Sequence, residues 1–527
     1  MAAHNAGADA QSHMTPDEFR ALGHRMVDLV ADYLRTVDRR PVLSAYRPGD
    51  LLARLPEHPP ERAERAAEWD AILRDVESLI IPGLTHWQHP SFFGYFPCNA
   101  SGPGILGELL SAGLGVQGML WQTSPTCTEL ETRMLDWCAE LFGLPDCFRS
   151  TADNKGLGGG GVIQGTASEA ALVALVAARR KWRRVRAQRT PADADAEIGL
   201  AESAIEKPFA VIASEAAHSS IAKAAMIAGV ADGPEDDDRL WSVPTDARGA
   251  MDLGVLRAVL DERLGLPGAP SPLAVVATVG TTGVGAIDPI ADLVRTLDEA
   301  WQTALGRPFD GWLHVDAAWA GSALVCPEHR AMIAGVERAD SIAINPHKWL
   351  LTNFDCNLFW TRARRDLTDA MSVTPEYLRN AASESGGVID YRDWQVPLGR
   401  RFRSLKLWFV IRHYGAEGLR AYIREHCRIA ALFERWVGRD SRFEMPVPRS
   451  LGLVCFRLRG DDRATRDLLD RVNATGRAFL THTTFAAPGV QPRLLARMAI
   501  GATATEERHV REAWRLIQST ADGITLP

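Results

Sequence analysis

The chain has 527 residues, of which 59 are Lys or Arg and 66 are Asp or Glu, so its formal net charge is −7. Apolar residues make up 46% and charged residues 24%, which excludes a disordered chain and provides no basic surplus for nucleic acid or an anionic membrane. No apolar run approaches the roughly 20 residues of a membrane span. The eight cysteines are scattered and the N-terminus is small and polar, so we expect reduced thiols, a cytoplasmic protein and no metal site.

The N-terminal region is predicted to be a helical arm. Thr15 and Glu18 form a capping box around Pro16, and apolar side chains from Phe19 to Tyr33 recur every three or four residues, which indicates an amphipathic helix. Residues 46–62 are rich in proline and are expected to be extended. Because residues 1–101 have no obvious core, the apolar face of this arm must be buried against the main domain or a second subunit.

Residues 102–403 are predicted to form a large α/β domain. Short apolar runs alternate there with helix-length segments, which is typical of a parallel sheet covered by helices on both faces. The runs are 209–213, 273–279, 312–315, 341–344 and 358–360. Ligands bind beyond the carboxyl ends of such strands, so we expect the polar residues that follow these runs to share one site.

Three other segments complete the predicted fold. Residues 183–207 are charged and rich in alanine, and are expected to be a solvated loop. Residues 366–390 are polar without a clear period, which predicts a long loop with a functional role. Residues 404–527 are expected to form a small α/β domain that contains long helices, strands at 450–458 and 496–501, and a closing helix at 505–518.

Lys348 and Asp316 are the first residues that suggest chemistry. Lys348 follows an apolar run between His347 and Trp349, and a lysine in apolar surroundings has the lowered pKa that covalent attachment to an aldehyde requires. Asp316 ends another apolar run, where its carboxylate could keep a pyridinium nitrogen protonated. Each residue also has an ordinary structural interpretation. Lys348 could be a solvated lysine at a strand end, and Asp316 could cap a helix or form an ion pair. Either interpretation would be preferred if its residue stood alone.

An anion site is predicted where residues 165–169 open an apolar helix. Free backbone N–H groups with the hydroxyls of Thr166 and Ser168 suit a phosphate, although plain helix capping explains these residues equally well. Residues 156–161 match the glycine spacing of dinucleotide folds, but no strand is expected before them, so we reject that interpretation. His218 follows another apolar run, and its ring could stack on a pyridine, although a lone histidine is more often structural.

A lysine for covalent attachment, an acid for a ring nitrogen, a stacking histidine and a phosphate site together indicate pyridoxal phosphate (PLP). The sequence resembles the group II PLP-dependent decarboxylases, specifically the aromatic L-amino-acid decarboxylases. Motifs that carry the resemblance include PSFFGYFP (90–97), HVDAAWAG (314–321) and NPHKWLLTNFDC (345–356). The resemblance implies PLP-dependent transferase fold type I, a mostly parallel seven-stranded sheet sandwiched by helices. It also implies a homodimer with shared active sites and a swapped N-terminal arm.

The resemblance also implies roles for individual residues. Lys348 would attach to the cofactor, Asp316 would pair with its ring nitrogen, His218 would stack on its ring, and Tyr377 would protonate the substrate carbon after carbon dioxide leaves. The implied cofactor-binding residues are Thr166, Ala167, Ser168, His218, Thr282, Asp316, Ala318, Asn345, His347 and Lys348. The implied substrate-binding residues are Trp87, Tyr95, Phe96, Pro97, Met119, His347 and Gly399. Met119 stands where the family often has an aromatic residue donated by the partner subunit.

Other activities on the same scaffold stay open. Aldehyde synthases carry Phe in place of the loop tyrosine, so Tyr377 favours an amine product. Histidine decarboxylases tend to carry Ser at the position of Gly399, so Gly399 disfavours histidine as the substrate. A glutamate decarboxylase needs basic residues in its substrate pocket, whereas this chain has the aromatic residues Trp87, Tyr95 and Phe96. We therefore expect decarboxylation of an aromatic L-amino acid of the tryptophan, tyrosine, phenylalanine, dopa or 5-hydroxytryptophan class. A catalytically silent dimer of the same fold is the alternative outside the enzymes.

Overall fold

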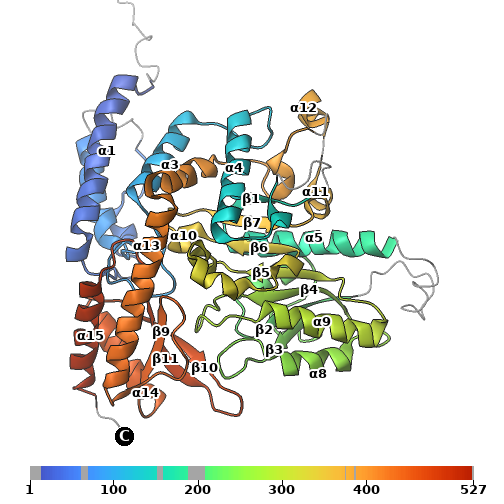
Figure 1. Ribbon diagram of the computed structural model, residues 1–527. Coiled ribbons are helices and arrows are strands. Elements are labelled where there is room, and N and C mark those ends of the chain that lie inside the picture. The colour runs from blue at the N-terminus through green and yellow to red at the C-terminus, as the bar shows by residue number, and fades with distance from the viewer. Residues whose placement is uncertain are drawn as a thin grey trace, which may run out of the picture.

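A seven-stranded sheet forms the centre of the molecule, and its strand order is β1-β7-β6-β5-β4-β2-β3 (Figure 1). The computed structural model describes residues 13–60, 69–150, 158–187, 208–373, 375–384 and 387–524. The strands are β1 (Gly160–Gln164), β2 (Phe209–Ser214), β3 (Leu240–Val243), β4 (Ser271–Thr278), β5 (Trp312–Asp316), β6 (Ser341–Ile344) and β7 (Asn357–Thr361). Strand β7 is antiparallel to both β1 and β6, and the other pairings are parallel. The predicted mostly parallel fold is confirmed.

Helices cover both faces of this sheet because its strands are buried on both sides. On one face, α5 (Ala167–Ala187) and α7 (Ser220–Ile227) pack over Val276 and His314. On the other face, the 3₁₀ segment η7 (Ala320–Val325) lies so close to Ile344 that Gly321 has no room for a side chain. Further helices of this domain are α8 (Leu253–Arg263), α9 (Ile290–Leu305), α10 (Pro346–Trp349), α11 (Arg364–Met371) and α12 (Ala381–Glu384).

A second sheet builds a smaller unit with its own hydrophobic core. Its antiparallel order is β10 (Thr481–Phe485), β11 (Arg493–Ala499), β9 (Leu453–Leu458) and β8 (Phe443–Glu444). The helices α14 (Asp462–Ala474) and α15 (Glu507–Ala521) pack against this sheet. Helix α13 (Arg403–Arg439) contributes to both cores and is interrupted at Gly415, whose φ is 62°.

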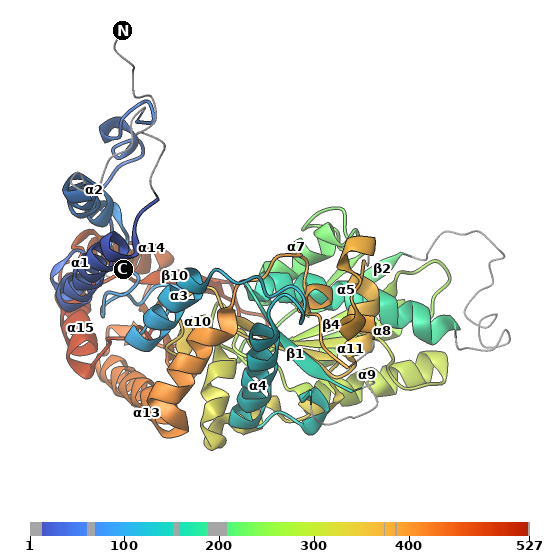
Figure 2. The ribbon, with the colours of Figure 1, turned by 90° about the horizontal axis from the view of Figure 1, so that it is seen from above.

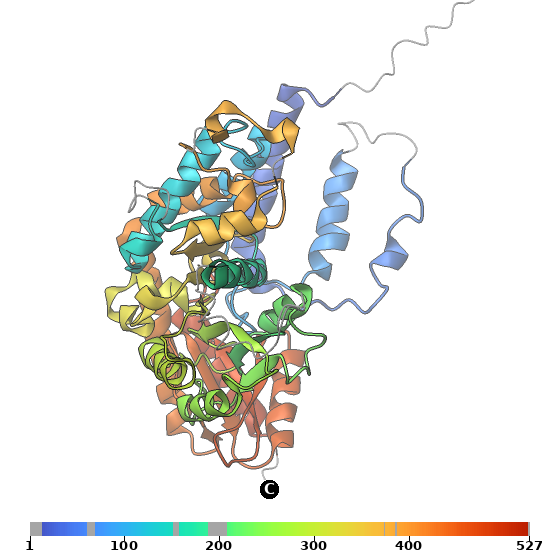
Figure 3. The same cartoon turned by 90° about the vertical axis from the view of Figure 1, so that its right-hand side faces the viewer.

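The N-terminal region lies against this smaller unit and partly stands away from it. Helix α1 (Pro16–Thr36) begins with the predicted capping box, and none of its residues is buried. Helix α2 (Trp69–Asp75) and the π-helical turn 76–80 project from the body, as Figures 2 and 3 both show. Helices α3 (Gly102–Leu114) and α4 (Pro125–Phe142) lead into the large sheet. Within the described residues, no helix has the length and hydropathy needed to cross a bilayer.

Three local expectations from the sequence need correction. The glycine-rich run at 160–164 is itself strand β1, because its partner β7 supplies the ladder hydrogen bonds that the glycines alone do not predict. Residues 183–187 continue helix α5, whereas 188–207 lie outside the described residues. The segment 366–390 is not one loop, since α11, α12 and a 3₁₀ turn at Glu376–Leu378 occupy much of it.

Candidate active site

A cavity of about 220 Å³ lies beyond the carboxyl ends of β2, β4, β5 and β6. These four strands are adjacent and parallel, so the residues that follow them meet at one edge of the sheet. The cavity is lined by Phe96, Thr166, Ala167, Ser168, His218, Ser220, Thr278, Gly280, Thr282, Asp316, Ala318, Trp319, Asn345, His347, Lys348 and Phe354. Every residue predicted to bind the cofactor therefore lies around this one space.

Lys348 enters the cavity from the short helix α10, directly after β6. Its backbone N–H donates to the carbonyl of Asn345, which begins the turn. Desolvation lowers the pKa of Lys348, and the nearby carboxylate of Asp316 opposes part of this shift. The Lys348 Nζ lies 5.8 Å from the centroid of the Phe96 ring. An amine with a lowered pKa is more often neutral, as attack on an aldehyde requires.

Asp316 is the last residue of β5 and is buried at the rim of the cavity. The backbone N–H of Ala318 donates to its Oδ1 over 3.0 Å. This bond turns the chain so that the small Ala318 side chain also faces the cavity. A buried carboxylate in this position attracts a cation, and a protonated pyridine nitrogen is one cation that would suit it.

Polar groups without hydrogen-bond partners face the cavity at the start of α5, at the end of β4 and directly after β6. Ala167 and Ser168 are the first residues of α5, where backbone N–H groups are not used within the helix. Asn345 Oδ1 and Thr278 Oγ1 are buried, and neither makes a hydrogen bond to any described residue. Such orphaned groups are costly unless a ligand satisfies them. These residues therefore fit a phosphorylated ring compound that fills the cavity.

Two histidines lie at the cavity and differ in their surroundings. The backbone N–H of Ser220 donates to Nδ1 of His218 over 3.1 Å, so the proton of the neutral ring is on Nε2. Desolvation and the charge of Lys348 lower the pKa of His218. His347 is buried more deeply, accepts a bond from the backbone N–H of Cys356, and has its pKa lowered by desolvation to about 4. Both rings are therefore uncharged at neutral pH.

One wall of the cavity is aromatic. Phe96 stacks on Trp319 with ring centroids 4.1 Å apart, and Trp319 stacks in turn on Trp349, next to Lys348. Trp87 and Tyr95 stack on each other nearby without lining the cavity, and Tyr95 is 54% exposed. Pro97, by contrast, is buried against Gly501.

Met119 and Gly399 do not line the cavity of their own chain. They lie next to each other, since the backbone N–H of Gly118 donates to the carbonyl of Arg400 and Gly399 packs against Gln117. Of the predicted substrate-binding residues, only Phe96 and His347 therefore line the cavity of their own chain.

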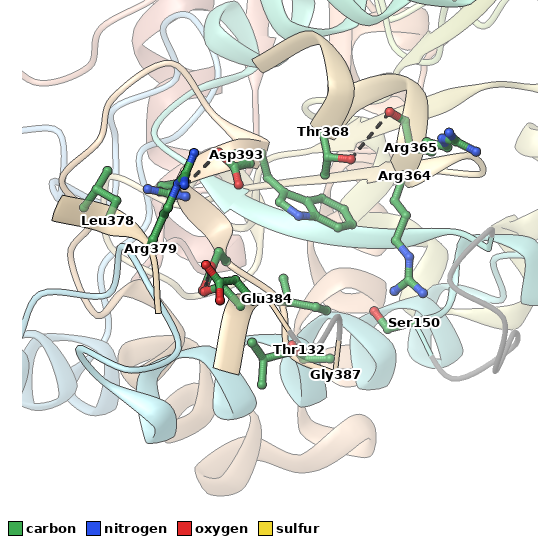
Figure 4. A pocket seen from close by; sticks show the side chains of 16 residues that line it. Thr132, Ser150, Arg364, Arg365, Thr368, Leu378, Arg379, Glu384, Gly387 and Asp393 are labelled. Carbon is green, nitrogen blue, oxygen red and sulfur yellow. Dashed lines mark hydrogen bonds and ion pairs between the residues drawn. The ribbon is translucent and has the colours of Figure 1, made fainter. Parts of the chain in front are cut away.

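Tyr377 lies in the 3₁₀ turn Glu376–Leu378, but its side chain is outside the described residues. A larger cavity of about 650 Å³ adjoins this turn, between α11, α12 and α4 (Figure 4). Charged side chains such as Arg379, Glu384 and Asp393 surround it, and no residue that the sequence predicted to be functional lines it. The cavity therefore borders the segment that carries Tyr377, through Leu378 and Arg379.

Several residues of the smaller cavity escaped the sequence analysis. They are Ser220, Thr278, Gly280, Trp319 and Phe354. Each lies within four residues of the end of a predicted strand or of a predicted site residue, and this closeness in sequence is what could have identified them. Their side-chain types carry no distinct chemistry of their own, which is why the sequence did not single them out.

Comparison with known proteins agrees with this geometry. The model of the pyridoxal-dependent decarboxylase conserved domain matches residues 48–459. Phenylacetaldehyde synthase from Arabidopsis thaliana is 44% identical over 98% of both chains, and aromatic-L-amino-acid decarboxylase from Bos taurus is 43% identical over 96% of this chain and 97% of its own. The crystal structure of Oryza sativa TDC with PLP and tryptamine has a TM-score of 0.85 and 38% identity, covering 97% of this chain and 99% of that one. Because the domain match spans most of the chain and includes every residue that lines the cavity with Lys348 and Asp316, this protein belongs to the pyridoxal-dependent decarboxylase family and uses PLP as its cofactor.

Proposed function

We propose that this protein decarboxylates an aromatic L-amino acid and releases the arylalkylamine and carbon dioxide. The observation that carries the proposal is a single cavity in which Lys348 and Asp316 face a space walled by Phe96. Its relatives include an aromatic-L-amino-acid decarboxylase, and a solved relative holds tryptamine. Stacked and edge-on aromatic contacts suit an aromatic substrate side chain.

The residues of the cavity divide the work of holding the cofactor. Lys348 attaches to its aldehyde, Asp316 pairs with its ring nitrogen, and His218 and Ala318 enclose its ring, with Thr282 beside it. Its phosphate is held by Thr166, Ala167, Ser168, Asn345 and His347. When bound, the cofactor accepts the electrons that the departing carboxylate leaves on the substrate carbon. The cavity walls orient the substrate so that the carboxylate bond is the one that breaks.

Tyr377 supplies the proton that completes the amine. A phenolic hydroxyl can donate a proton to carbon, and a Phe at this position could not. The aldehyde synthase reaction is a second candidate, since phenylacetaldehyde synthase is among the relatives. Tyr377 favours the amine-forming reaction over it. Gly399 likewise argues against histidine as the substrate.

The active unit is a homodimer in which each subunit completes the site of the other. Helix α1 buries no residue, although its apolar stripe includes the exposed Phe19 and Met26. Helix α3 exposes a row of leucines that would be costly to leave in water: Leu106, Leu109, Leu110 and Leu114. A second copy that covers these faces would bring Met119 and Gly399 to its neighbour's cavity.

The proposed division into domains is the one expected from the sequence: an arm at 1–101, a large domain at 102–403 and a small domain at 404–527. The last boundary falls at the start of α13.

The cysteines are free thiols, most of them buried, which supports a reducing compartment such as the cytoplasm.

A carbon-dioxide-release assay tests the function. The substrates are tryptophan, tyrosine, phenylalanine, dopa, 5-hydroxytryptophan, histidine and glutamate, and each product is identified. We expect release from at least one aromatic amino acid, with its amine as the product. The Lys348→Ala variant is the control, since it should release nothing and lack the near-ultraviolet to visible absorbance of attached PLP. Release from glutamate or histidine alone would contradict the proposal.

A further inference from the structure

Arg400 is a buried arginine that directly follows Gly399 in the chain. Its side chain forms an ion pair with Glu131 of α4 at a distance of 2.5 Å. The Nη1 atom of Arg400 donates to Oε1 of Gln395 over 2.8 Å, and its Cζ lies 4.9 Å from the centroid of the Tyr391 ring. The guanidinium is therefore held by a carboxylate, an amide and an aromatic ring that come from two distant parts of the chain.

The backbone of Arg400 holds the segment that contains Met119. Its N–H donates to Oε1 of Gln117, and its carbonyl accepts from the backbone N–H of Gly118 over 3.1 Å. Gly399 also lies against the side chain of Gln117. Because the peptide groups of Arg400 connect the two stretches, the position of its guanidinium fixes where Met119 and Gly399 lie.

Glu131 connects this arrangement to the large sheet. Its Oε1 accepts from the backbone N–H of Ile163 over 2.8 Å, and the carbonyl of Ile163 accepts from Nη2 of Arg400 over 3.3 Å. Ile163 belongs to β1, which is also held by its ladder with β7. The strand therefore provides a fixed support, and Arg400 transmits the position of that support to Met119 and Gly399.

Stability alone does not explain this ion pair. Both side chains are at most 1% exposed, and removing two charges from water costs about as much as their attraction returns. Apolar side chains of similar volume often stabilise such a site equally well. A charge-assisted hydrogen bond, however, has a narrow range of distances and angles, whereas apolar contacts permit sliding. The pair is therefore suited to fixing a position.

We propose that Arg400 is a positioning residue that sets the substrate affinity of the neighbouring subunit's active site. The proposal rests on the proposed function, in which Met119 and Gly399 complete the neighbour's cavity. Arg400 does not line the cavity of its own chain, and it acts by holding these two residues against Glu131. Its loss should therefore weaken substrate binding in the opposite subunit, while Lys348 and PLP of its own chain are unaffected.

The test compares two heterodimers that carry the same two substitutions and are purified through two different affinity tags. Both contain Lys348→Ala, which leaves one active site, and both contain Arg400→Met. When the two changes are in one chain, the active site receives Gly399 from that altered chain, and kcat/KM for the preferred aromatic amino acid should fall by roughly 10- to 100-fold, chiefly through KM. When they are in opposite chains, the active site receives Gly399 from a chain with an intact Arg400. Its kcat/KM should then stay within about threefold of a heterodimer with Lys348→Ala alone.

Further variants separate positioning from folding. Arg400→Met leaves the buried carboxylate of Glu131 unpaired, so Glu131→Gln is added in the same chain to remove that charge while retaining an acceptor for Ile163. This pair of changes should show the same dependence on the arrangement of the chains. Arg400→Lys keeps the charge and should recover part of the loss. Arg401→Met alters an exposed neighbour and should show no dependence on the arrangement.

The difference between the two arrangements decides the outcome, because folding defects affect both heterodimers alike. Equal kcat/KM in both, a loss only when the changes are in opposite chains, or an effect confined to PLP affinity would each overturn the proposal. A wild-type enzyme that acts on no aromatic amino acid would instead refute the proposed function. The dissociation constant of 3-phenylpropionate, an unreactive aromatic acid, then replaces kcat/KM in the same comparison, with the same difference expected.

Discussion

Lys348 illustrates how a common residue acquires a special role from its position. Its neighbours His347 and Trp349 are buried, and the cavity is closed on one side by aromatic rings. The sequence predicted Lys348 and Asp316 because a charged residue directly after an apolar run is unusual. It did not predict Thr278, since a threonine at the end of a strand is common and its unpartnered hydroxyl becomes visible only when the surrounding side chains are in place.

The Tyr377→Phe variant tests the proton donor. Without the phenolic hydroxyl, the variant should still bind PLP but in air should divert product from the amine toward the aldehyde. The substrate carbon that is no longer protonated promptly can be oxidised by dioxygen, which leaves as hydrogen peroxide, and water then releases the aldehyde and ammonia. Product identification by mass spectrometry after a single set of incubations measures the ratio. A variant that forms only amine at the wild-type rate would show that another group donates the proton.

Buried histidines should make the stability of the protein depend on pH. Desolvation lowers the pKa values of His314, His347 and His426 to about 4, below the unfolded value of about 6.5. Between those two values the unfolded chain binds protons that the folded chain does not. The free energy of unfolding should therefore fall as the pH is lowered from 6.5 toward 4, by about 1 kcal/mol per pH unit for each histidine.

Denaturant titrations at several pH values measure this dependence. The His426→Asn variant should reduce the slope by about one histidine's share, whatever it does to the stability at pH 7 through the lost bond from Trp349 Nε1. His413→Asn changes an exposed histidine of the same helix and should keep the wild-type slope. Identical slopes in all three proteins would show that these groups are not buried in the neutral form.

At the scale of elements, strands were predicted best where the sequence has a continuous apolar run. The prediction at 341–344 coincides with β6, and those for β2, β4, β5 and β7 differ only at their ends. Strand β1 was missed because glycines disfavour strands, and only its pairing with β7 compensates. Strand β3 was missed because the polar Ser242 interrupts its short apolar run.

The segment between α11 and η11 (Tyr391–Trp394) should be the part of the large domain most accessible to protease. It contains the exposed Arg379, whose ion pair with Glu376 is also exposed, beside the 650 Å³ cavity. Trypsin should cut the ligand-free enzyme after Arg379 before other sites, and PLP with a substrate analogue should slow the cut. Mass spectrometry of the fragments identifies the site, and Arg379→Gln should abolish it. Preferred cleavage elsewhere would contradict a loosely packed segment.

At the scale of the whole molecule, the apolar face of the arm was predicted to be buried against the main domain or a second subunit, and the structure leaves that face of α1 uncovered in the single chain. The exposed leucines of α3 were not predicted from the sequence. What the sequence could not reveal is that Met119 and Gly399 lie together and away from their own cavity. That arrangement depends on long-range packing of residues 117–119 against 399–400.

Shared sites can be tested by combining two inactive variants. Lys348→Ala removes the attachment point, and Gly399→Trp should block the cavity of the neighbouring subunit. In each heterodimer, one of the two sites receives Lys348 from one chain and Gly399 from the other, so purified heterodimers should recover about half of the wild-type activity and a random co-expressed mixture about a quarter. Each variant alone provides the baseline. No recovery in verified heterodimers would indicate that each subunit builds its site alone.

The stack of Trp319 on Trp349 beside the cavity also provides an optical signal. Indole emission overlaps the absorption band of PLP, and these two rings lie within energy-transfer range of anything that fills the cavity. The chain has 15 tryptophans, so loading the enzyme should quench only a fraction of its intrinsic fluorescence. A Trp319→Phe variant would retain the aromatic wall while reducing that fraction, which turns cofactor occupancy into a quantity that can be followed in real time without any label.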